Sequence, residues 1–193
     1  MKTAFAIAIA AALLLFGRIA SAHRIDEYLQ ATLVSFEPDR LQMSMRLIPG
    51  VLVAPALIVA IDSDGDGVFS DIEQRAYAGR VLSDVALAVD GKAVQAKLVS
   101  LSFPPAAQMR EGLGEIHIEY SVALPSGGGN HRLTLENHHQ GRSSVYLVNA
   151  LAPQDHAIRL VAQKRNARQS LYQVDYQQNS AAVTAPLDKV QLR

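Results

Sequence analysis

The sequence predicts a mainly β protein, an antiparallel β-sandwich that carries an inserted helix–loop–helix segment. Apolar and polar residues alternate with a period of two over most of the chain, which is typical of strands with one buried face. Asp-Gly and glycine-rich turns separate several of these segments. One region, residues 51–83, instead has helical runs on either side of an acidic loop. Two packed sheets with one helical insertion account for these three observations.

The first 22 residues have the pattern of a secretory signal peptide. Lys2 supplies a positive charge, residues 4–16 form an apolar run, and Ala20-Ser21-Ala22 is a small-x-small cleavage site. The run is shorter than the roughly 20 residues that span a bilayer, so cleavage is favoured over an uncleaved membrane anchor. We therefore expect a periplasmic or otherwise exported protein whose mature chain begins at His23.

About nine strands are expected in the mature chain. Residues 41–47 and 116–124 alternate strictly and should be half-buried, whereas Tyr28–Phe36 and Val145–Leu151 are apolar on both faces, which favours central strands. The remaining expected strands are 85–89, 94–103, 132–136, 158–163 and 171–176.

Two turns predict which strands pair. Asp90-Gly91 lies between residues 86–89 and 94–98, and the glycine-rich segment 126–130 separates the strand ending at Leu124 from the next one. Both turns favour hairpins, so each pair of strands is expected to be antiparallel and adjacent.

The domain expected from these elements covers residues 23–178. Helices are predicted at 51–61 and 71–83, which makes 51–83 an insertion between strands, and a polar tail follows at 179–193. The uncharged stretch 47–61 is too short and too interrupted by Pro and Gly to cross a bilayer, so no membrane span is expected in the mature chain.

Composition excludes several classes of function. Lys and Arg together number 18, as do Asp and Glu, so no basic surplus is present for nucleic acid. The chain has no Cys, which rules out disulfides, a thiolate nucleophile and sulfur-ligated metal. A metal would therefore be bound by oxygen or imidazole.

The loop 62–73 has the spacing of a twelve-residue EF-hand loop, in which oxygen atoms surround one calcium ion. Calcium is a hard cation, so alternate carboxylates, one backbone carbonyl and a terminal glutamate suit it. The expected calcium ligands, at loop positions one, three, five, seven, nine and twelve, are Asp62, Asp64, Asp66, Val68 through its carbonyl, Ser70 through a water, and Glu73.

Other positions of the loop support the same interpretation. Gly67 should adopt a positive φ, Phe69 should point inward, and Ser70 with Glu73 can form a capping box, although we expect Glu73 to bind metal first. The alternative is a solvated turn with a helix cap, but four carboxylates would not converge without a cation. Because no second such loop occurs in the sequence, a structural calcium ion is favoured over a sensor.

The histidines offer a second metal-binding hypothesis. His23 would carry a free amine beside its imidazole after cleavage, a pair that can chelate copper or nickel, with His138 or His139 as a third ligand. A solvated turn at 138–139 is the competing and favoured explanation. The other three histidines, His117, His131 and His156, are expected at the surface.

No catalytic constellation is found in the sequence. A nucleophile elbow and a zinc-protease motif are lacking, and the acidic pairs Asp26-Glu27 and Asp71/Glu73 have structural explanations. We therefore expect no enzyme activity and no catalytic or organic-cofactor site. A hydrolase remains the weakest alternative, and a pocket that joins polar side chains from several strands would favour it.

Four blocks of the sequence look familiar: residues 23–34, the run 49–62 into the acidic loop, 110–114 and 144–151. Together they resemble the extracytoplasmic region that precedes the membrane helices of HupE/UreJ-like bacterial proteins. That family is associated with nickel or cobalt uptake. Because no hydrophobic helices follow Leu192, the resemblance implies an exported domain that serves a membrane-protein partner and is not itself a permease.

Overall fold

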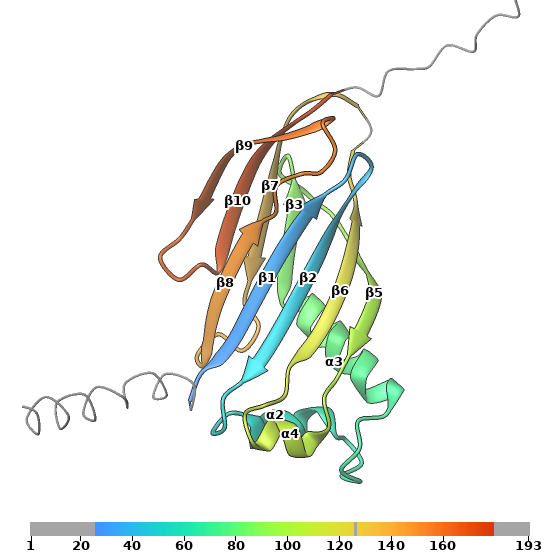
Figure 1. The fold of residues 1–193 in the computed structure, drawn as a ribbon, viewed down its shortest axis with the longest axis vertical. Coiled ribbons are helices and arrows are strands. Elements are labelled where there is room, and N and C mark those ends of the chain that lie inside the picture. Colours follow the sequence, from blue (N-terminus) through green and yellow to red (C-terminus); the bar gives the residue numbers. More distant parts are fainter. Residues whose placement is uncertain (1–25, 126, 180–193) are drawn as a thin grey trace, which may run out of the picture.

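A computed structural model of the 193-residue chain describes residues 26–125 and 127–179 (Figure 1). It is mainly β, with ten strands in two sheets and three described helices. The strands are β1 Tyr28–Phe36, β2 Arg40–Pro49, β3 Val85–Val89, β4 Lys92–Ala93, β5 Ala96–Ser102, β6 Ile116–Ala123, β7 Gly129–Asn137, β8 Ser144–Ala150, β9 Ile158–Arg165 and β10 Leu171–Gln178. The helices are α2 Ala54–Ile61, α3 Asp71–Ser83 and α4 Ala106–Arg110.

The two sheets stack face to face, which confirms the predicted β-sandwich (Figure 1). One sheet has the order β5-β6-β2-β1-β8 and the other has the order β4-β3-β7-β10-β9. Every strand pair is antiparallel except β1 with β8, which run parallel from the pair Tyr28 and Ser144 to the pair Val34 and Ala150.

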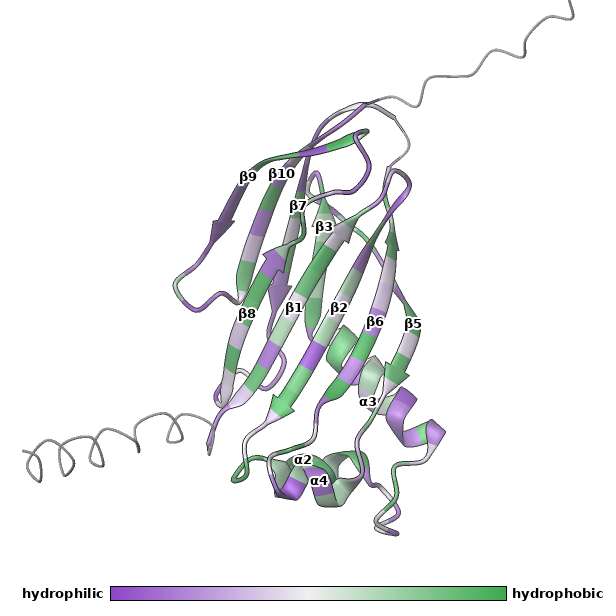
Figure 2. Cartoon of the chain, viewed as in Figure 1, coloured by the Kyte–Doolittle hydropathy of each residue, from purple (hydrophilic) through white to green (hydrophobic). Residues whose placement is uncertain are grey.

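The core lies between the sheets because the strands alternate as the sequence predicts. Inward-facing side chains of β2 and β6 are buried and their neighbours are more exposed, so green and purple alternate along the strands in Figure 2. Five tyrosines are among the largest fully buried side chains: Tyr28, Tyr77, Tyr120, Tyr172 and Tyr176. Each buries a polar hydroxyl with its ring, and that hydroxyl needs a hydrogen-bond partner.

The prediction that Val145–Leu151 forms a central strand is wrong, because β8 lies at a sheet edge. Its outward side chains Val145 and Leu147 are 36% and 43% exposed, so the second apolar face is surface and not core. The edge is nevertheless covered from the other sheet. Arg165 of β9 donates from Nε to the carbonyl of Val148 at 2.9 Å, which occupies a backbone group that a further strand would use.

The hairpin predicted at Asp90-Gly91 is confirmed next to the turn but not along the following strand, and the hairpin predicted at 126–130 is wrong. Lys92–Ala93 pairs with β3 as β4, but the following strand, β5, crosses to the other sheet and pairs with β6. The glycine-rich segment 126–130 likewise connects β6 to β7 in the opposite sheet. A turn between two sheets and a turn within one sheet have the same residue preferences, so the local pattern could not distinguish them.

The helical insertion lies between β2 and β3, at one end of the sandwich (Figure 1). Helix α3 has the predicted bounds, whereas α2 begins at Ala54 and not at Val51, because residues 51–53 form a turn closed by the carbonyl of Gly50. The short helix α4 was not predicted. It follows Pro105 and packs beside α2.

No helix within the described residues is both long and apolar enough to cross a membrane. The predicted signal peptide, His23 and nearly all of the polar tail lie outside the described residues.

Candidate metal site

The acidic loop connects the end of α2 to the start of α3. Ser70 is the N-cap of α3, with an extended backbone and a side chain that accepts a hydrogen bond from the Glu73 N–H. The Glu73 carboxylate accepts in return from the Ser70 N–H at 3.0 Å, which completes a capping box. This cap fixes where the helix begins and therefore where the loop ends.

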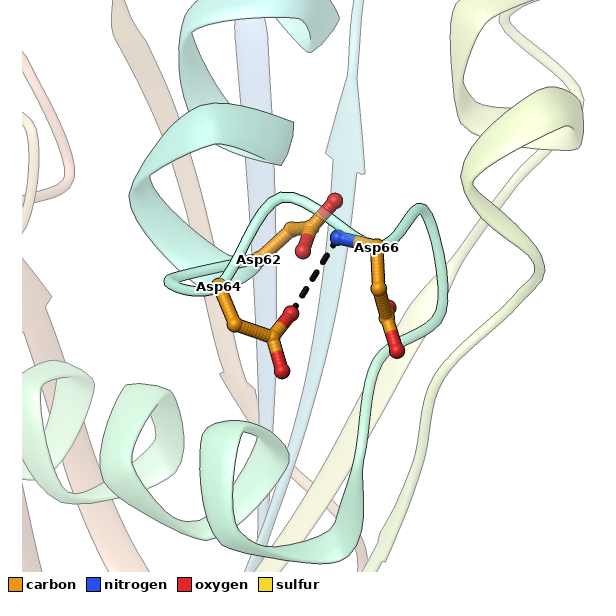
Figure 3. Close-up of side chains that lie close together, drawn as sticks. All are labelled: Asp62, Asp64 and Asp66. Atoms are coloured by element: carbon orange, nitrogen blue, oxygen red, sulfur yellow. Dashed lines mark hydrogen bonds between the residues drawn. The ribbon is translucent and has the colours of Figure 1, made fainter.

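Three carboxylates converge in this loop (Figure 3). One oxygen each from Asp62, Asp64 and Asp66 lies within 4.8 Å of the others. Calcium–oxygen distances of about 2.3–2.6 Å allow two ligands of one ion to lie up to about 5.2 Å apart. The three side chains are therefore close enough to bind a single ion together. Asp62 is half-buried, and Asp64 and Asp66 are exposed.

Backbone N–H groups of the loop hold these carboxylates in place. Asp62 accepts from the N–H of Gly65 at 2.9 Å and of Gly67 at 3.0 Å, one on each oxygen. Asp64 accepts from the Asp66 N–H at 3.2 Å, the bond drawn in Figure 3. The two glycines have φ of 75° and 85°, so the chain turns through the left-handed region, where a Cβ is costly. The positive φ predicted for Gly67 is confirmed.

Glu73 lies apart from the three aspartates. Its carboxylate accepts from the N–H and hydroxyl of Ser63 and from the N–H and hydroxyl of Ser70. These donors, with the Ser70 N–H first, lower the pKa of Glu73 to about 2. The residue is only 6% exposed and is ionised at neutral pH. Its role as a metal ligand stays a prediction, because it would have to exchange these bonds for the ion.

The remaining loop positions divide between surface and core. Val68 is 65% exposed, and its role as a ligand through its backbone carbonyl stays a prediction. Phe69 is buried, as predicted, with its ring centroid 6.2 Å from that of Phe103. The inward Phe69 ring therefore attaches the loop to the body of the protein.

The two adjacent histidines of the second hypothesis occupy different environments. The side chain of His138 is 62% exposed, whereas that of His139 is 3% exposed. His139 Nδ1 lies 2.7 Å from Asp84 Oδ2, and Nε2 lies 2.9 Å from the Tyr77 hydroxyl. Both ring nitrogens are thus engaged, and a metal at this ring would have to displace one of these bonds.

His139 belongs to a buried hydrogen-bond network that the sequence analysis missed. The Tyr28 and Tyr77 hydroxyls are 2.7 Å apart, and Gln30 Nε2 donates to the His139 carbonyl at 2.9 Å. We call the residues Tyr28, Gln30, Tyr77, Asp84, Asn137, His139, Ser144 and Tyr146 the buried polar network. It joins β1, α3, β8 and the turn after β7. Its members are spread over more than 100 residues of sequence, so no local spacing could have indicated it.

A hollow of about 680 Å³ at the β3–β4 turn joins polar side chains from several strands. Its charged groups pair with one another: His131 with Asp90 at 2.7 Å and Arg132 with Asp175 at 2.6 Å. His131 is more buried than predicted, with a side chain 15% exposed and its ring 5.4 Å from that of Tyr176. These pairs connect neighbouring strands, which explains why the groups are present in the hollow.

Comparison of the chain with models of protein families, with curated proteins and with solved structures finds no match.

Proposed function

We propose that this protein binds one calcium ion in the loop 62–73 and that the ion stabilises the helical insertion. The convergence of the Asp62, Asp64 and Asp66 carboxylates is the observation that carries the proposal. Three negative charges so close together repel one another, and a divalent cation removes that repulsion. Loop N–H groups hold the Asp62 and Asp64 carboxylates in place, so these two ligands need little rearrangement before binding.

The ligand chemistry favours calcium over transition metals. Carboxylate and carbonyl oxygens are hard ligands, and this loop offers no imidazole or thiolate. Carboxylates arranged around a tight turn with two glycines at positive φ also suit the larger and less directional calcium ion better than magnesium, which demands near-octahedral geometry.

The proposed role is structural, within an exported protein. The loop sits at one end of the molecule and connects two helices whose inner faces pack on the sandwich. Binding would fix this end as a surface for a membrane-protein partner, the role suggested by the sequence resemblance. The apolar N-terminal run supports export, and the mass of the protein purified from the producing cells tests it: cleavage after Ala22 gives a chain beginning at His23.

Isothermal titration of chelator-treated protein tests calcium binding. We expect one ion per chain, with an affinity anywhere from micromolar to millimolar, and no binding by the double variant Asp62→Ala with Glu73→Ala. Asp71→Asn is the matched control, because it removes a nearby exposed charge at a position that offers no expected ligand. The proposal fails if millimolar calcium gives no heat of binding, or if the double variant binds as the parent does.

A further inference from the structure

Tyr77 lies one helical turn after Glu73 on the inner face of α3. Residues four apart on a helix lie above one another, and both side chains are buried. Any movement of the first turn of α3 that accompanies a change at Glu73 therefore displaces Tyr77 as well.

Two further contacts connect Tyr77 to the loop. Its ring centroid is 6.0 Å from that of Phe103, which in turn lies 6.2 Å from Phe69 within the loop. The Arg80 guanidinium lies over the Tyr77 ring, 5.4 Å from its centroid, and donates to the carbonyl of Ala60 at the end of α2. Tyr77 is thus connected through Phe103 to Phe69 within the loop, and through Arg80 to Ala60 at the end of α2, just before the loop.

The hydroxyl of Tyr77 fixes this arrangement to the sandwich. A carboxylate such as that of Asp84 accepts hydrogen bonds, so His139 donates from Nδ1, and its Nε2 accepts from the Tyr77 hydroxyl. The Tyr77 oxygen then accepts from Tyr28 on β1. The Tyr77 hydroxyl therefore has two partners, and its removal leaves both Tyr28 and His139 without one of their hydrogen bonds.

We propose that Tyr77 is a positioning residue for the calcium loop, which sets calcium affinity through α3 and transmits calcium occupancy to His139. The inference rests on the proposed function. Because coupling between two sites is reciprocal, a hydroxyl that alters calcium affinity must itself be altered by calcium. The change can be measured at His139, which lies 62 residues from Tyr77 in the sequence.

The test compares two substitutions of a buried tyrosine by phenylalanine. Tyr77→Phe keeps the ring contacts with Phe103 and Arg80 and removes only the hydroxyl. We expect calcium binding to weaken about fivefold by isothermal titration. Tyr172→Phe is the control, because its hydroxyl bonds to Gln163 and its ring lies under Arg165, both on β9. The calcium affinity of the Tyr172→Phe variant should stay within about twofold of that of the parent, even if its stability falls.

A second readout separates positioning from a general loss of stability. In the parent protein, the NMR signals of the His139 ring should shift with calcium at the same apparent Kd as the titration, while those of exposed His138 stay in place. Unchanged affinity in Tyr77→Phe, or an unmoved His139 ring while calcium binds, overturns the inference and leaves calcium binding intact. No calcium binding by the parent overturns the proposed function and this inference together.

Discussion

The acidic loop 62–73 and the buried polar network are both clusters of polar groups, but they are built in opposite ways. Two of the three aspartates in the loop are exposed, and most of the bonds that hold them come from loop backbone. In the network, the side chain of His139 is 3% exposed, and its two ring nitrogens bond to Tyr77 on α3 and to Asp84, the residue that follows this helix.

This difference distinguishes polar groups that can bind a ligand from polar groups that stabilise the fold. Exposed carboxylates close to one another carry excess charge that an ion can neutralise. Buried groups that already satisfy one another would lose free energy if a ligand displaced them. The loop is therefore where we place function, and the network is where we place the stability of the insertion.

The largest expected effect is on the network. His139→Ala removes ring contacts with Tyr28 and Tyr77 and leaves the Tyr77 hydroxyl without its acceptor. We expect a loss of about 3 kcal/mol in the free energy of unfolding, measured with urea in calcium-free buffer. His138→Ala is the adjacent control and should change stability by less than about 0.5 kcal/mol. Equal effects of the two would remove the distinction between the buried and exposed histidines.

Calcium itself should stabilise the folded protein by a similar amount. At 100 times its dissociation constant it should add about 2.7 kcal/mol, because it binds the folded loop and hardly the unfolded chain. Thermal unfolding with and without chelator measures this. The sandwich has its own apolar core, so hydrogen exchange after chelation should increase mainly within residues 51–83. Complete unfolding on chelation would show that the sandwich depends on calcium as much as residues 51–83 do, which contradicts this prediction.

Removal of the helix cap should change the free energy of unfolding less than either His139→Ala or calcium binding does. Ser70→Ala removes a side chain that both accepts from the Glu73 N–H and donates to the Glu73 carboxylate. A loss of about 1 kcal/mol is expected in calcium-free buffer. Ser83→Ala, at the exposed end of the same helix, should cost less than about 0.5 kcal/mol. If urea unfolding gives the same loss of free energy for Ser70→Ala and Ser83→Ala, the capping box does not fix the start of α3.

The smallest expected effect is that of pH on the network. Burial lowers the pKa of His139, and the Asp84 carboxylate opposes part of this shift while Arg80 adds slightly to it. A lowered pKa in the folded state means that the unfolded chain binds the proton more readily. Stability should therefore fall as pH decreases from about 6.5, the ordinary pKa, towards the lower folded value. Urea unfolding between pH 7 and 5 should show this decrease in the parent, and His139→Gln should flatten it.

Several features of the loop could be predicted from the sequence because they depend on residues that are close together in the chain. Three aspartates at alternate positions, Gly67 at positive φ and the inward Phe69 all lie within eight consecutive residues. The period of two likewise indicated the strands, since each strand buries one face whichever neighbours it has.

Strand partners and the network could not be predicted in the same way. The pattern of β8 is apolar on both faces, and only the fold shows that Val145 and Leu147 lie on the outside of an edge strand. His138 and His139 are equivalent in sequence, and only the position of α3 decides that His139 is buried. Such features depend on contacts between distant segments, which a single sequence does not specify.

Strand β1 is synthesised first, yet it lies inside its sheet, between β2 and β8. Gln30 and Ser144, which bond across the pair with β8, are 114 residues apart. Closing so long a stretch of chain costs entropy before any contact compensates for it, so we expect the joining of β8 to limit the folding rate. Until then, β1 exposes an unpaired edge of the kind that recruits strands from other molecules. A nascent or truncated chain that lacks β8 is therefore the form most in need of a chaperone.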